Sequence, residues 1–116
     1  MKPFAVFDTN ILVSALISRR SDTAVVLALE AMLSGDVIPL YNDEILQEYD
    51  NVLHREKFHL PDALVDATIR QIKEDGIASE RVHTEEAFPD PTDIVFYEVA
   101  LSKEDSFLVT GNRVLL

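Results

Sequence analysis

Hydrophobic and polar positions follow two different patterns along the chain, one of which predicts strands and the other helices. Short, continuous apolar runs are typical of strands buried on both faces, and they occupy residues 3–7, 37–41 and 106–110. Apolar residues at helical spacing lie between these runs, and they predict helices over residues 11–16, 23–33, 42–58, 61–76 and 90–102. Residues 77–83 are ambiguous and are compatible with a short strand.

Capping residues place several of the expected helix ends. Residues 21–22 (Ser-Asp) are the expected N-cap of the second helix, and Gly35 is expected to end it. Residues 42–43 (Asn-Asp) supply the cap of the third helix, and Gly76 ends the fourth.

Strands that alternate with helices predict an α/β fold in which helices flank a central, mainly parallel sheet. The chain has 116 residues, 47% of them hydrophobic, and neither an internal repeat nor a Gly/Ser linker. We therefore expect one domain over residues 1–116. Ligands of such folds gather beyond the carboxyl ends of the strands, so a functional site is expected at that edge.

The sequence contains neither cysteine nor a targeting or membrane segment. The lack of cysteine excludes disulfides, zinc ribbons and thiol nucleophiles. The first residues lack the apolar core and cleavage site of a signal peptide. No stretch approaches the roughly 20 apolar residues that span a bilayer. These features indicate a cytoplasmic protein that does not associate with a membrane.

The formal net charge of −11 argues against a general binder of phosphate backbones, which carries a basic face. Two explanations stay open: carboxylates gathered around a divalent cation, or an acidic surface that meets a basic partner. A solvated acidic surface accounts for most of these residues.

Three aspartates stand where the sheet edge is expected. Asp8 directly follows the first strand, and Asp90 and Asp93 open the last helix in the sequence Asp-Pro-Thr-Asp. Each has a structural explanation, because Asp8 suits a helix N-cap and Asp90-Pro91-Thr92-Asp93 suits the start of a helix. Each also has a functional one, because their carboxylates can converge at one edge. The pattern alone leaves both interpretations open.

Glu48 lies in the helix of residues 42–58, just outside its apolar stripe. From this border a carboxylate can reach over the core toward the sheet edge, although an exposed helical glutamate is the simpler interpretation. Glu44 lies further round, toward solvent. The histidines stand at no metal-ligand spacing and are expected to be ordinary surface residues: His54, His59 and His83.

Four sequence blocks, in order along the chain, resemble those of the PIN-domain family. The first is an apolar strand that ends in Asp, with Thr and Asn after it, at residues 5–14. The second is Ile-Leu-x-Glu-Tyr at residues 45–49, and the third is Asp-Pro-x-Asp before an apolar helix at residues 90–96. The fourth is a strand followed by Thr-Gly-Asn at residues 107–112. Each block is weak alone, whereas the ordered set is fairly specific.

Within that family the blocks resemble the branch of toxins from toxin–antitoxin systems, related to the VapC type. The resemblance implies a three-layer PIN-like fold, an endoribonuclease that uses Mg²⁺ or Mn²⁺, a cognate antitoxin, and a homodimer. Hard cations of this kind prefer oxygen ligands, activate water and offset charge on phosphoryl oxygens. Whether one or two ions bind stays open. The implied metal-site and catalytic residues are Asp8, Glu48, Asp90 and Asp93, with Thr9, Asn10, Thr110 and Asn112 in support.

Two features depart from the family's pattern. Asn112 stands where this branch often has Asp, and Val114 stands where a further acidic residue usually follows. The chain ends at Leu115-Leu116, whereas members of the family usually continue through another strand or helix. A domain shortened at its C-terminus is therefore an alternative to a complete one.

Two rival functions also stay open. A phosphohydrolase of the haloacid-dehalogenase type opens with an apolar strand and a nucleophilic Asp in the pattern Asp-x-Asp, but here Asn10 replaces the second Asp. A catalytically degenerate PIN fold that binds RNA or protein is favoured by Asn112, by Val114 and by the short C-terminus.

Overall fold

The apolar run at the start of the chain forms β1 (Phe4–Phe7), the middle strand of a five-stranded sheet with the order β3-β2-β1-β4-β5. β2 (Ile38–Tyr41) and β4 (Ser106–Thr110) both pair in parallel with β1. β3 (Ile77–Ala78) pairs in parallel with β2, and β5 (Arg113–Leu115) pairs antiparallel with β4. The expected α/β fold with a mainly parallel sheet is confirmed, and β5 is an addition that the sequence patterns did not predict.

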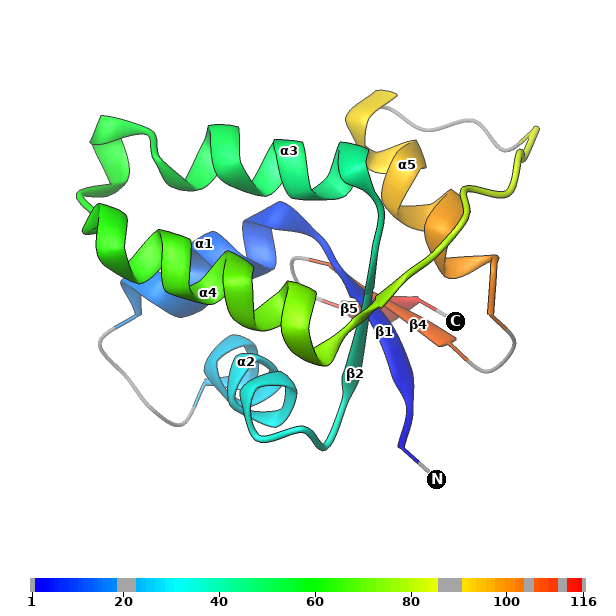
Figure 1. Cartoon of the computed structure of the whole chain (residues 1–116), viewed down its shortest axis with the longest axis horizontal. Helices are drawn as coiled ribbons and strands as arrows, with labels where there is room; N and C mark the ends of the chain where they lie inside the picture. Colours follow the sequence, from blue (N-terminus) through cyan, green and yellow to red (C-terminus); the bar gives the residue numbers. More distant parts are fainter. Residues whose placement is uncertain (1, 19–22, 86–90, 104–105, 111–112, 116) are drawn as a thin grey trace.

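The structure, a computed structural model, shows helices on both faces of this sheet (Figure 1). The residues it describes are 2–18, 23–85, 91–103, 106–110 and 113–115. The helices are α1 (Thr9–Ile17), α2 (Ala24–Leu33), α3 (Asp43–Leu53), the 3₁₀ turn η1 (Glu56–Phe58), α4 (Asp62–Asp75) and α5 (Pro91–Ala100). None of the helices in these ranges is both long and apolar enough to cross a membrane.

Topology decides which face each helix covers. The connections from β1 to β2 and from β2 to β3 run across the sheet in one direction, and the connection from β3 to β4 returns. Crossovers between parallel strands are right-handed. α1 to α4 therefore cover one face and α5 covers the other, as Figure 1 shows. In Figure 1, α5 begins on the side of the sheet where β1 and β2 end, which is the carboxyl edge, and runs toward the start of β4.

Three predicted helix ends are confirmed. The side chain of Asn42 caps α3 by accepting a hydrogen bond from the Ile45 N–H at 2.8 Å. Gly35, just past the end of α2, has a φ of 87°, a conformation that glycine adopts without strain. Gly76 follows α4, and its N–H donates to the Ile72 carbonyl at 2.9 Å.

Two other predicted helix ends are wrong. α2 begins at Ala24 and is capped by Thr23, whose Oγ1 accepts from the Val26 N–H, rather than by residues 21–22, which lie outside the described residues. α3 ends at Leu53 instead of continuing to residue 58. The ring of His54 caps this end, because its Nδ1 bonds one of the last helical carbonyls.

The core lies between β1 and the helices on both faces. The predicted apolar stripe of α3 is confirmed, with Leu46 at its border half-buried. Among the most completely buried side chains are Val6 of β1, Leu12 of α1, Leu40 of β2, Ile45 and Tyr49 of α3, Val65 of α4 and Val99 of α5.

Candidate functional site

Asp8 stands at the carboxyl end of the central strand, between β1 and α1. Its Oδ1 accepts a hydrogen bond from the Asn10 N–H at 2.7 Å, so the N-cap interpretation is confirmed. Its own N–H donates to the Val109 carbonyl at 3.0 Å, which fixes Asp8 beside the end of β4. A carboxylate offers about four lone-pair sites, so capping is compatible with a second role as a cation ligand.

Tyr49 ties α3 to the same end of β1. Its side chain is buried, and its hydroxyl donates a hydrogen bond to the main-chain carbonyl of Phe7. Burial raises the pKa of the Tyr49 phenol, and the negative charge of Asp8 raises it further. The phenol therefore stays protonated, and Asp8 lies within electrostatic reach of it. Glu48, the preceding residue of α3, is half-buried.

Glu48 lies on the flank of α3 that is turned toward α5. Glu44 stands one helical turn earlier on the same flank. The Glu44 carboxylate pairs with Arg81, with 2.7 Å between Glu44 Oε2 and Arg81 Nη1. Arg81 also binds Glu98 of α5. The flank of α3 that carries Glu48 is thus the one joined to α5.

The first turn of α5 lies at the same carboxyl edge of the sheet as Asp8. Its helix begins at Pro91, as the Asp-Pro-Thr-Asp sequence predicts. The ring centroid of Phe96 lies 6.2 Å from that of Tyr49, and Asp93 stands one turn before Phe96. The backbone of Asp93 therefore lies in the first turn of α5, at the carboxyl edge of the sheet.

The remaining predicted site residues are only partly described. Thr110 is the last residue of β4, and its backbone pairs with that of Arg113. Asn10 is exposed in the first turn of α1. Asp90 and Asn112 lie outside the described residues.

Thr9, the residue after Asp8, has a buried side-chain hydroxyl that a hydrated cation at this edge could satisfy. Its side chain is 5% exposed, and within the described residues its hydroxyl has no hydrogen-bond partner. A buried hydroxyl without a partner costs about 1–3 kcal/mol. The donors at this edge are carboxylate and hydroxyl oxygens, which are the ligand types that Mg²⁺ and Mn²⁺ prefer. The residues present therefore fit such an ion.

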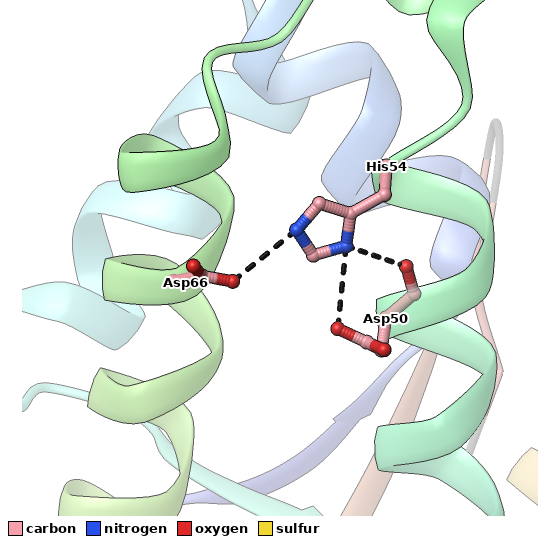
Figure 2. A group of neighbouring side chains, drawn as sticks. All are labelled: Asp50, His54 and Asp66. Carbon is pink, nitrogen blue, oxygen red and sulfur yellow. Dashed lines mark hydrogen bonds and ion pairs between the residues drawn. The ribbon is translucent and has the colours of Figure 1, made fainter.

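A second group of acidic side chains surrounds His54, between α3 and α4 (Figure 2). Its Nδ1 lies 2.8 Å from the main-chain oxygen of Asp50 and 3.2 Å from the carboxylate of the same residue. Its Nε2 lies 3.2 Å from Asp66 Oδ1 and 3.9 Å from Asp62 Oδ1. The expectation that His54 is an ordinary surface residue is therefore wrong, because folding brings three carboxylates around its ring.

The ring of His54 links α3 to α4, and the same group has the spacing of a potential metal site. One potential ligand atom from each of Asp50, His54 and Asp66 lies within 4.8 Å of the others. Nδ1 faces a carbonyl oxygen, which only accepts, so Nδ1 carries a hydrogen and only Nε2 is left to bind a metal. Asp50 and Asp66 stand at opposite nitrogens of the ring (Figure 2). When the ring is protonated, both of its N–H groups face an aspartate and an ion pair joins the two helices.

Sequence reasoning missed the network of Arg81, Glu44 and Glu98. Glu98 is only 2% exposed, and its carboxylate accepts hydrogen bonds from the Arg81 side chain and the Thr84 N–H. The hydrogen bond from Arg81 lowers the pKa of Glu98, and Glu98 in turn raises the pKa of Arg81. One feature of the sequence could have indicated this network. Glu98 is the single charged residue in the apolar stretch of residues 94–101, so a buried carboxylate with a charged partner could have been predicted there.

Comparison with known proteins gives one match. The family model of the PIN domain matches residues 5–114 of the chain. The comparisons with curated proteins and with solved structures gave no significant match.

Proposed function

Because this chain belongs to the PIN-domain family, we propose that it is a metal-dependent endoribonuclease, with its active site at the carboxyl edge of the sheet. PIN domains are typically nucleases that use divalent metals. The observation that carries the proposal is the Tyr49–Phe7 hydrogen bond, which holds α3, and with it Glu48, against the end of β1 where Asp8 stands.

The proposed ligands of the ion are Asp8, Glu48 and Asp93, with Asp90 as a fourth acidic member. When bound, Mg²⁺ or Mn²⁺ would activate water and offset the charge that develops on the phosphoryl oxygens. The protein supports this site in two ways. The protonated phenol of Tyr49 fixes the backbone beside Asp8, and the Asn10 N–H orients the Asp8 carboxylate. Thr9, Thr110 and Asn112 are proposed to support the site through hydrogen bonds.

The acidic net charge of −11 is compatible with an RNA substrate under this proposal. Carboxylates at the site would repel phosphate, and a bound divalent cation would offset part of this charge and give the phosphate oxygens a positive ion to contact. Cation binding is thus expected to precede RNA binding.

The proposed biological role is that of a toxin that is restrained by a cognate antitoxin and is homodimeric. The resemblance to toxin–antitoxin toxins supports this role. Apolar surface also supports protein partners, because α2 carries Glu30 as its single charged residue and Leu27 is 53% exposed. Expression in a bacterial host should arrest growth, and Asp8→Asn should abolish the arrest. Growth that continues with the folded wild type would contradict a toxin role.

The enzymatic proposal is tested by cleavage of a mixed RNA pool with Mg²⁺ or Mn²⁺ and with EDTA. The wild type is compared with Asp8→Asn and Asp93→Asn, and with Asp66→Asn as the control from the His54 group. We expect EDTA to abolish cleavage. Asp8→Asn and Asp93→Asn should lower it at least about 100-fold, since even residues that only orient metal ligands change affinity or activity about 10–100-fold. Asp66→Asn should cleave like the wild type.

Three results would count against this proposal. A folded wild type that does not cleave RNA would favour a degenerate PIN fold that binds RNA or protein. Loss of cleavage in Asp66→Asn but not in Asp8→Asn would move the site to the group around His54. A phosphoryl-enzyme trapped on Asp8 would favour a phosphohydrolase.

A further inference from the structure

The segment that leads from β3 toward α5 is fastened to α5 by one buried carboxylate. Glu98 accepts hydrogen bonds from Arg81 Nε and, at 2.6 Å, from the Thr84 N–H. Its main-chain carbonyl accepts a third, from the Val82 N–H at 3.0 Å. A buried carboxylate is tolerated only when it is paired in this way. Arg81 binds it directly, whereas His83 Nδ1 lies 3.8 Å from Glu98 Oε2.

The same guanidinium reaches the neighbouring helix. Its Nη1 lies 2.7 Å from Oε2 of Glu44 in α3, a carboxylate whose side chain is 57% exposed. The guanidinium is planar and presents its N–H donors in a fixed geometry. Two carboxylates that bind its Nε and its Nη1 are therefore held at a set separation, which a flexible ammonium would not impose.

Each of the two carboxylates shares a helix with a proposed metal ligand. Glu44 stands one turn before Glu48 on the same flank of α3. Glu98 stands five residues after Asp93 in α5, about 7.5 Å along the helix axis. Over such distances an α-helix moves as one piece, so the spacing between Glu44 and Glu98 sets how α3 and α5 present Glu48 and Asp93. The ring contact between Tyr49 and Phe96 is the apolar part of the same helix pair.

We propose that Arg81 is a positioning residue of the metal centre: by joining Glu44 to Glu98 it holds α3 against α5 and so fixes the backbone of Asp93 relative to that of Glu48. This inference rests on the proposed function, because it concerns the ion that the active site would hold. In this proposal Arg81 acts through Glu44 and Glu98 and is not itself a ligand of the ion.

The test uses substitutions that keep the charge and change the reach. Arg81→Lys removes the guanidinium that binds Glu44 and Glu98 at the same time. Glu44→Asp shortens an exposed side chain that does not contribute to the core. The matched controls are Arg70→Lys in α4 and Glu30→Asp in α2, both at exposed positions. The Mn²⁺ affinity is measured by calorimetric titration without RNA, cleavage is measured as a function of Mn²⁺ concentration, and circular dichroism confirms folding.

We expect Arg81→Lys and Glu44→Asp to raise the Mn²⁺ dissociation constant about tenfold. The Mn²⁺ concentration for half-maximal cleavage should rise by a similar factor, and saturating Mn²⁺ should restore most of the rate. The two controls should match the wild type. Glu44→Asp keeps the test decisive even if Arg81→Lys fails to fold, because it leaves Glu98 paired.

Two outcomes would overturn the inference alone. One is a folded Glu44→Asp or Arg81→Lys protein that binds Mn²⁺ as the wild type does. The other is an effect limited to the charge-removing variants Glu44→Gln and Arg81→Gln, which would assign Arg81 an electrostatic role instead. A wild type that neither binds Mn²⁺ nor cleaves RNA would overturn the proposed function, and the inference with it.

Discussion

The hydroxyl of Tyr49 donates its hydrogen to the carbonyl oxygen of Phe7, the last residue of the central strand. The two residues are 42 positions apart, and their contact brings two of the four sequence blocks together. Since Asp8 follows Phe7 and Glu48 precedes Tyr49, this single bond holds the backbones of these two proposed ligands near each other.

Removal of that hydroxyl should destabilise the fold. Tyr49→Phe leaves the ring in the core but deprives the Phe7 carbonyl of a donor, so we expect the free energy of unfolding to fall by about 1 kcal/mol. Tyr41→Phe is the matched control, because the Tyr41 hydroxyl donates to the Lys73 carbonyl at 3.3 Å at an exposed place. Urea unfolding measures both. Equal losses of unfolding free energy in the two variants would show that the buried hydrogen bond stabilises the fold no more than the exposed one.

Two substitutions of Asp8 should separate its cap role from its proposed ligand role. Asparagine caps helices as well as aspartate does, so Asp8→Asn should change the free energy of unfolding by less than about 0.5 kcal/mol. Asp8→Ala should lower it by about 1 kcal/mol. Both should lose metal-dependent cleavage. If Asp8→Asn unfolded as readily as Asp8→Ala, the charge of Asp8 would matter to the fold, and the separation would fail.

Gly76 should tolerate no side chain, for a steric reason. A Cβ built there lies 2.5 Å from the main-chain oxygens of both Ile72 and Pro39. Gly76→Ala should therefore lower the free energy of unfolding by about 1–3 kcal/mol, in the range of overpacked cores. Gly35→Ala should cost about 1–2 kcal/mol for a different reason: the left-handed φ of 87° strains an L-residue, whereas the added Cβ would make only an ordinary contact with Lys2 Nζ at 3.7 Å. Chemical denaturation of both variants is the measurement, and wild-type stability in Gly76→Ala would contradict this packing.

The ion pairs of His54 predict a contribution to stability that depends on pH. The hydrogen bond to the Asp50 carbonyl raises the pKa of His54 above its ordinary 6.5, and the carboxylates of Asp50, Asp66 and Asp62 raise it further. A raised pKa in the folded state stabilises the fold when the ring is charged. The contribution is fully present below pH 6.5 and is lost as the pH rises through the higher folded-state value.

Thermal unfolding of the wild type and His54→Gln across this range checks the sign. The difference in melting temperature should be largest at acidic pH and should shrink as the pH rises past the folded-state pKa. The same comparison in an Asp66→Asn background should show a smaller dependence on pH, because one of the facing charges is gone. A difference that grew with pH would mean that the ring is neutral in the folded protein.

The sequence by itself determined most of the elements, though neither β5 nor the end of α3. The three buried strands, the caps at Asn42 and Gly35, and the apolar stripe of α3 all depend on residues close together in the chain, so local patterns predict them. The end of α3 was missed because the ring of His54 competes for a helical carbonyl, and periodicity does not register that contact.

The tertiary structure alone decided which charges meet. Arg81 lies 37 residues from Glu44 and 17 from Glu98, and no local spacing indicates those pairs. The strand order β3-β2-β1-β4-β5 likewise depends on which helices cover which face of the sheet, and no single segment of the sequence indicates it. Local backbone preferences act over a few residues and are written in the sequence. Ion pairs between helices need the finished packing, because only the fold brings distant side chains within reach of each other.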